Sequence, residues 1–84
     1  MKEETRGTPR NVIIEREPVE LYKVLKFEGL AENGGAAKAL VSEGAVRVNG
    51  ELETRKRRQL VAGDIIACAG HTLRLVRADS AAQS

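Results

Sequence analysis

The chain has 84 residues, of which 42% are hydrophobic and 31% are charged, and its formal net charge is +2. This length fits one small domain, and the apolar fraction is too high for disorder to be the default. A lone cysteine excludes an internal disulfide, and no segment approaches the roughly 20 apolar residues of a membrane helix. The first ten residues lack an apolar signal core, so we expect a soluble, cytoplasmic protein.

Charge is distributed unevenly along the chain. Residues 1–44 carry 7 basic and 8 acidic side chains, whereas residues 45–77 carry 7 basic and only 3 acidic side chains. A basic second half points to an anionic partner such as nucleic acid.

The ends of the chain lack a periodic apolar pattern. We predict flexible tails at 1–10 and 78–84, which flank a single domain at 11–77. Inside this domain, residues 12–15 read as a short strand.

A first helix is predicted after this strand. Pro18 suits a helical first turn because its missing N–H costs nothing there, and Gly29 is a natural stop. Apolar side chains follow helical spacing between these two residues and are expected to pack in the core. They are Leu21, Tyr22, Val24, Leu25 and Phe27.

A second helix is predicted between Asn33, a good N-cap, and Gly44, a natural stop. Its small apolar side chains would let it lie close against the first helix. They are Ala36, Ala37, Leu40 and Val41.

Apolar residues then alternate with polar residues, as in a hairpin around Asn49-Gly50. A two-residue loop would place Leu52 on the face opposite to Val46 and Val48. We prefer a three-residue loop, because it keeps Leu52 on the same face as the valines.

A turn at 61–64 precedes a second predicted hairpin at 65–76. With Gly70-His71 as the turn, Cys68 lies opposite Leu73, and Ile66 lies opposite Leu75. The predicted fold class is therefore α+β, with two packed short helices followed by a small, mainly antiparallel sheet.

Four adjacent cations lie between the two hairpins: Arg55, Lys56, Arg57 and Arg58. One interpretation is a solvated loop that keeps the sheet soluble. The other is a phosphate-binding surface, because adjacent cations repel one another, which gives a fold no gain, and arginine forks match phosphate oxygens. On this second interpretation, Lys38 and Arg47 would extend the basic surface.

The start of the second helix is another candidate site. The backbone of Asn33, Gly34 and Gly35 would let a phosphate approach the helix N-terminus closely. Alternatively, the glycines only allow close packing or a bend, since no lysine follows in the spacing of a phosphate-binding loop.

Evidence for other chemistry is thin. Cys68 and His71 are two ligands, which do not make a metal site, and we expect a buried thiol and a turn residue. No nucleophile has a base beside it, so we expect no enzyme, no metal and no cofactor.

The order of these parts resembles a known family. Residues 20–66 are similar to the RNA-binding domain first described in small-subunit ribosomal protein S-four. The matching motifs are Glu28-Gly29-Leu30-Ala31, Ala37 to Val41, Gly44 to Gly50, and Val61 to Ile65. Within this family, the chain looks most like the small stand-alone bacterial proteins of the YbcJ-like group.

The resemblance implies an alpha-L motif whose helices, adjoining strand and loop bind structured RNA. It carries over to Lys38, Arg47 and the basic loop. Two positions depart from the family: Gly34 replaces a frequent arginine, and Glu20-Leu21-Tyr22 replaces Arg-Leu-Asp. The run from Arg55 to Arg58 is the expected replacement for the lost phosphate contacts.

We therefore predict a non-catalytic, ribosome-associated RNA-binding module that recognises ribosomal or transfer RNA as a monomer, without a small-molecule substrate. The alternative is a protein-interaction adaptor that docks on a ribosome-associated or RNA-processing partner through the same basic surface. Only two aromatic residues are present, Tyr22 and Phe27, so base stacking is not expected to be the main mode of binding.

Overall fold

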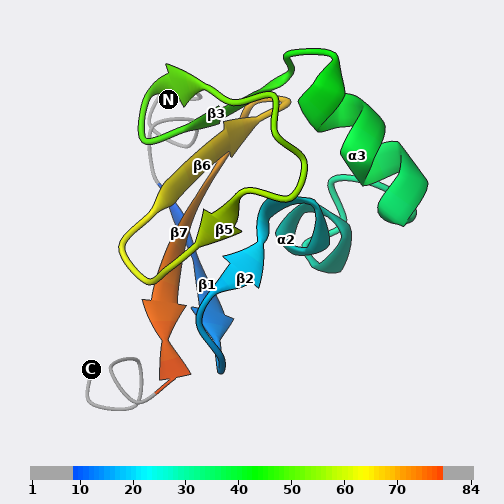
Figure 1. Ribbon diagram of the computed structural model, residues 1–84. Helices are drawn as coiled ribbons and strands as arrows, with labels where there is room; N and C mark the ends of the chain where they lie inside the picture. The colour runs from blue at the N-terminus through cyan, green and yellow to red at the C-terminus, as the bar shows by residue number, and fades with distance from the viewer. Residues whose placement is uncertain (1–8, 79–84) are drawn as a thin grey trace.

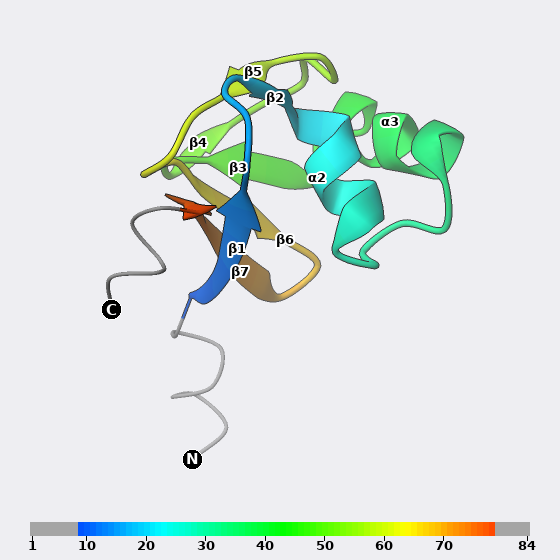
Figure 2. The same ribbon diagram turned by 90° about the horizontal axis from the view of Figure 1, so that it is seen from below.

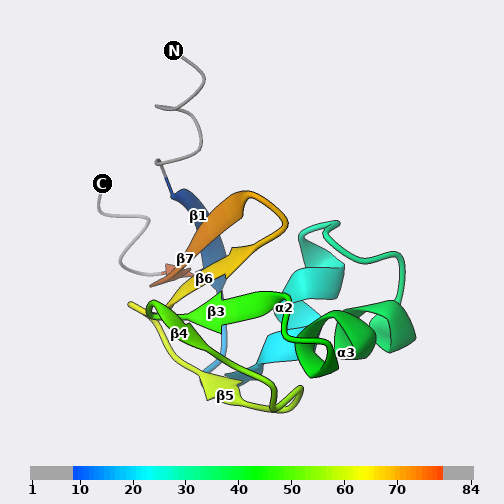
Figure 3. The same ribbon diagram turned by 90° about the horizontal axis from the view of Figure 1, so that it is seen from above.

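A computed structural model describes residues 9–78 of the chain. Most of the predicted tails, 1–10 and 78–84, lies outside the described residues, but Arg10 already belongs to the first strand. The α+β fold class is confirmed. Two helices lie on the same side of a five-stranded sheet (Figure 1 and Figure 3). The elements in chain order are β1 (Arg10–Ile14), β2 (Val19–Glu20), α2 (Leu21–Phe27), α3 (Gly34–Ser42), β3 (Val46–Val48), β4 (Glu51–Leu52), β5 (Gln59–Leu60), β6 (Ile65–Cys68) and β7 (His71–Arg77).

The five-stranded sheet has the order β1-β7-β6-β3-β4. All neighbouring strands are antiparallel except β1, which pairs parallel with β7 and forms one edge. Figure 2 shows β1 alongside β7. A separate two-stranded sheet joins β2 to β5, and it connects the start of α2 to the second half of the chain.

Both helices end as their sequences predict. Leu30 N–H donates to Leu25 O and Gly29 N–H donates to Lys26 O, and the equivalent two bonds close α3 at Gly44. This is the Schellman arrangement, in which glycine adopts a positive φ, here 78° at Gly29 and 83° at Gly44.

The start of the first helix differs from the prediction. Pro18 does not lie in the first helical turn, because Val19 and Glu20 are held extended by pairing with Leu60 and Gln59. The helix begins only at Leu21. Phe27 is also not in the core, since it is 69% exposed at the end of α2.

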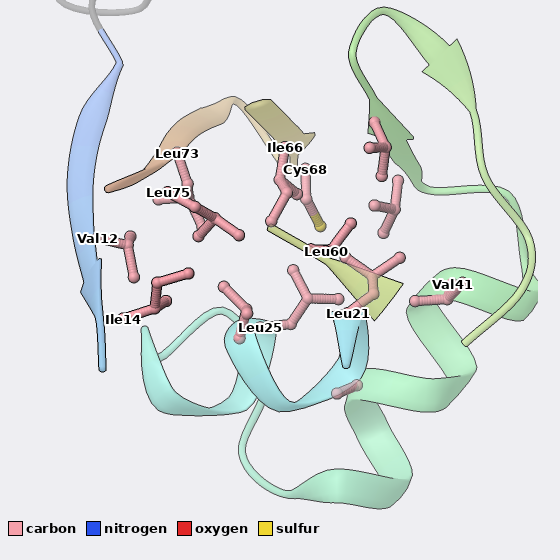
Figure 4. Close-up of a cluster of buried hydrophobic side chains, with 14 residues drawn as sticks. Val12, Ile14, Leu21, Leu25, Val41, Leu60, Ile66, Cys68, Leu73 and Leu75 are labelled. Atoms are coloured by element: carbon pink, nitrogen blue, oxygen red, sulfur yellow. The ribbon is translucent and has the colours of Figure 1, made fainter. Parts of the chain in front are cut away.

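The core lies between the helices and the sheet (Figure 4). Leu25 of α2 points into this core, and Leu21 lies beside Leu60 of β5. Ala37 and Val41 are fully buried on α3, which confirms that small side chains bring the two helices together.

The first hairpin has a two-residue loop, so the predicted three-residue loop is wrong. Val48 pairs with Glu51 and Arg47 pairs with Leu52, and Asn49 and Gly50 both have positive φ. Leu52 therefore lies on the face opposite to the valines and is 55% exposed.

The second hairpin turns one residue earlier than predicted. Ala69 and Gly70 form the turn, so Cys68 pairs with His71 and Ile66 pairs with Leu73. Each pairing is shifted by two residues from the prediction. Because side chains alternate with period two, the predicted buried face is unchanged.

Candidate nucleic-acid interface

The basic residues lie in the loop between β4 and β5. The backbone N–H of Arg58 donates to Arg55 O at 3.1 Å, which closes a turn with Lys56 and Arg57 at its tip. Both tip residues are exposed, and neither has an ion-pair partner within residues 9–78. The tip therefore presents two free cations to the solvent.

The other two cations share one carboxylate. Glu53 is only 5% exposed, and its Oε2 accepts from the backbone N–H and the Nε of Arg55, both at 2.9 Å. Its Oε1 accepts from Arg58 Nη1 at 2.7 Å and from Arg55 Nη2 at 3.3 Å. Hydrogen bonds from the Arg55 side chain, opposed by burial and reinforced by Arg58, lower the pKa of the Glu53 carboxyl to about 2.

This arrangement corrects the expectation that four adjacent cations give the fold no gain. Arg55 and Arg58 satisfy a buried carboxylate, which would be costly to leave unpaired. The sequence indicates that Glu53 lies beside arginines able to form salt bridges, but it does not predict that the carboxylate is buried. The available signal was an acidic residue two positions before an arginine at the end of a strand.

The same loop holds the start of helix α2. Leu21 N–H donates to Arg58 O at 2.9 Å, and Tyr22 N–H donates to Lys56 O at 3.1 Å. Glu20, at the N-cap position, makes no side-chain capping bond. The loop backbone therefore supplies acceptors that a helix usually obtains from a capping side chain.

Tyr22 connects this loop to helix α3. Lys38 Nζ lies 4.7 Å from the centroid of the Tyr22 ring, within the range of a cation–π contact. Gly34 lies beside the same ring, since a Cβ at this position would be 3.7 Å from Tyr22 Cε2. Tyr22 thus joins three parts of the candidate site: its ring contacts Lys38 and lies beside the start of α3, and its backbone N–H binds the basic loop.

The start of α3 is capped by Asn33, as predicted. Asn33 Oδ1 accepts from Ala36 N–H at 2.8 Å, and Asn33 O accepts from Ala37 N–H. Neither Gly34 nor Gly35 has a positive φ, and a Cβ on either would meet no backbone atom of another segment. Backbone geometry therefore does not require these two glycines.

Arg47 lies on strand β3, whereas the other candidates lie on helix α3 and in the loop. Its neighbours Val46 and Val48 are buried, so Arg47 projects from the outer face of the sheet, beside Leu52 and Ala67. The backbone links it to the basic loop, because Glu53 N–H donates to Val46 O at 3.0 Å.

The two signature turns of the sequence meet each other. Asn49 Nδ2 donates to Asp64 Oδ1 at 3.1 Å, and Asn49 Oδ1 accepts from Ile65 N–H at 2.9 Å. Asp64 Oδ2 accepts from Val61 N–H, which closes its own turn. The side chains of Asn49 and Asp64 therefore hold together the turn before β4 and the turn after β5. The basic loop lies between these two turns in the chain.

The remaining candidates do not form a site in the structure. Cys68 is buried, which raises the pKa of its thiol, and His71 is exposed beside the second turn. Within residues 9–78, no group of three histidine, cysteine, aspartate or glutamate side chains could hold a metal ion. No helix in this range has the length and apolar character needed to cross a membrane.

Comparisons with known proteins show which proteins this chain is similar to. A family model for the S4 domain matches residues 12–76. The chain is 48% identical over 58 residues to the putative RNA-binding protein YbcJ of Escherichia coli strain K12. This match covers 69% of this chain and 83% of that protein. It is 36% identical over 59 residues to the probable ribosome maturation protein RlbA of Bacillus subtilis strain 168. This match covers 70% of this chain and 83% of that protein.

A solved structure is also similar. The solution structure of E. coli YbcJ superimposes with a TM-score of 0.64 at 39% identity, and the match covers 83% of this chain and 90% of that one. That structure is described as revealing an αL motif involved in RNA binding.

Proposed function

Since this chain belongs to the S4 domain family, we propose that it is a non-catalytic RNA-binding module that recognises structured RNA through its basic surface. We define this surface as Lys38, Arg47, Arg55, Lys56, Arg57 and Arg58. The names of two relatives support the proposal: one is a putative RNA-binding protein and the other a probable ribosome maturation protein. Ribosomal RNA or transfer RNA is the RNA class that we propose.

One observation carries this proposal: two unpaired cations, Lys56 and Arg57, are exposed on a loop that is itself fixed to the fold. A fixed loop loses less conformational entropy on binding than a free one. An RNA phosphate chain would supply the counter-charge that these side chains lack within residues 9–78. Lys38 lies on the same side of the molecule, because Tyr22 contacts both its ammonium group and the loop backbone.

The proposal has three further parts. We propose that the protein acts as a monomer, and in the cytoplasm, where folded ribosomal and transfer RNA occur. We also propose that it performs no catalysis. The only histidine, His71, lies in the exposed end of a hairpin rather than beside a nucleophile.

The test is RNA binding as a function of salt concentration. Each lost phosphate contact should reduce the slope of log affinity against log salt by about 0.7 to 0.9. A Lys56→Ala/Arg57→Ala variant should therefore lose about 1.4 to 1.8 from the slope. The matched control is Arg16→Ala/Lys26→Ala, which removes the same charge from exposed positions outside the basic surface.

Three results would count against the proposal. Equal slopes for both double variants would show that the loop does not contact RNA. Competition by an unrelated polyanion such as heparin as effectively as by folded RNA would support the protein-interaction adaptor instead. Turnover of the bound RNA by the purified protein would contradict the non-catalytic assignment.

A further inference from the structure

We propose that Glu53 is a positioning residue for RNA binding, which divides the basic loop into two anchored arginines and two phosphate-binding cations. Arg55 and Arg58 form the anchored pair, and Lys56 and Arg57 form the binding pair. This inference rests on the proposed function and deepens it, because it states which of the four cations contact phosphate and which residue holds them in place.

Geometry is the first support. The Glu53 carboxylate accepts hydrogen bonds from Arg55 and Arg58, which are the first and last residues of the turn. Both ends of the turn are therefore held by one buried group. Lys56 and Arg57 lie between these two held ends, so their side chains stay at the tip of the turn.

Charge is the second support. Four adjacent cations repel one another, and repulsion alone would spread the loop over many conformations. Glu53 cancels one positive charge inside the loop and orders two of the arginines. Arg55 directs its Nε and Nη2 at the carboxylate, and that edge of its guanidinium group cannot grip a phosphate at the same time.

Burial is the third support. The Glu53 side chain is only 7% exposed, whereas the Arg55 side chain is 74% exposed and the Arg58 side chain 29%. Releasing both arginines to RNA would leave a buried carboxylate without a partner, at a large cost. RNA therefore gains more by binding the tip than by competing for the anchored pair.

The first experiment compares two arginines of the same loop. Arg57→Ala should weaken binding of folded RNA by about tenfold and reduce the salt slope by about 0.7 to 0.9, as expected for one lost charged contact. Arg55→Ala removes the same side chain and the same charge two positions earlier, but Glu53 keeps its bonds to Arg58 and to the backbone N–H of residue 55, so the tip stays anchored. This variant should weaken binding by less than about threefold and change the salt slope by less than half as much as Arg57→Ala. An equal loss in the two variants would overturn the division.

The second experiment tests whether Glu53 acts through the tip. Glu53→Gln keeps the shape of the side chain and removes its charge, and Glu51→Gln on exposed β4 is the control with the same change in net charge. In the Glu53→Gln background, Arg57→Ala should weaken binding by about threefold or less, because a disordered tip makes a poorer contact. A full tenfold loss in this background would show that Glu53 only supports folding.

Trypsin cleavage gives a readout that does not need RNA. The protease cuts after lysine and arginine in mobile segments, so the native loop should resist it. At a temperature where both variants stay folded, Glu53→Gln should be cut between residues 55 and 58 at least about fivefold faster than Glu51→Gln, because a local opening exposes the loop.

Equal cleavage rates would overturn the positioning role, whatever the result with RNA. If wild-type protein shows this resistance yet binds no RNA, the proposed function fails and the phosphate assignment fails with it. If it binds RNA but the two arginine variants behave alike, only the present inference fails. If Glu53→Gln does not fold, the comparison of Arg55→Ala with Arg57→Ala still decides the division.

Discussion

Glu53 is the one buried charged side chain within residues 9–78, and its chemistry makes folding depend on pH. Its pKa falls from 4.5 to about 2 in the folded state, so the folded protein holds the carboxylate more strongly in its charged form than the unfolded chain does. The resulting stability is fully present above about pH 4.5 and is lost as the pH falls toward 2.

We expect Glu53 to contribute about 1–3 kcal/mol to the free energy of unfolding at pH 7, the upper value being reduced by solvent around Arg55. Urea denaturation of wild type and Glu53→Gln between pH 7 and pH 3 measures this contribution. The difference between the two proteins should shrink as the pH falls, because the wild-type carboxyl becomes neutral as well. A difference that does not change with pH would contradict the assignment.

Single residues were predictable where one local rule decides their role. Asn33 followed by an apolar periodic segment predicted a cap, and its side chain accepts from Ala36 N–H as expected. Phe27 lies at the flank of the predicted apolar face and was expected to pack in the core, but it is exposed because α2 ends at this residue. The phosphate-binding roles of the basic residues stay predictions.

At the scale of elements, the hairpins show how a local rule and a packing assumption compete. Asn49-Gly50 is the sequence that a two-residue turn with two positive φ angles prefers, and the structure has this turn. The three-residue alternative requires a buried Leu52, and this side chain is 55% exposed. In the second hairpin, Ala69 adopts a φ of 53°, which is uncommon for alanine and therefore hard to predict.

The register of the first hairpin can be tested by comparing two leucines. Leu60→Ala should reduce the free energy of unfolding by about 2–5 kcal/mol, because Leu60 is fully buried. Leu52→Ala should cost less than about 1 kcal/mol, since this side chain is mostly exposed. Chemical denaturation measures both values. Similar losses for the two variants would indicate that Leu52 packs in the core after all.

At the scale of the whole molecule, the two edges of the sheet differ in character. Strand β4 at one edge leads into the basic loop, whereas β1 at the other edge lies outside the segment that carried the family resemblance. Its role in the fold is nevertheless central, since Val12 and Ile14 are buried against the sheet residues Leu73 and Leu75 (Figure 4). The sequence predicted a strand here but not its parallel pairing, because that contact joins opposite ends of the chain.

Buried and exposed side chains alternate along β1, and comparing one of each tests whether this strand belongs to the core. Ile14→Ala should cost about 2–3 kcal/mol of unfolding free energy, because the side chain is 8% exposed and completes the core. Ile13→Ala should cost less than about 1 kcal/mol, because its side chain is 59% exposed. Denaturation should show one cooperative transition for both variants. A separate early transition for Ile14→Ala would mean that β1 is an appendage rather than part of one folding unit.

The backbone bonds from Leu21 and Tyr22 to the basic loop have a consequence for measurement. Amide protons in the first turn of a helix usually exchange with water quickly, since they have no partner within the helix. These two exchange only when the loop opens. Their exchange rates therefore report loop opening from positions in helix α2, whose own chemistry no substitution in the loop changes.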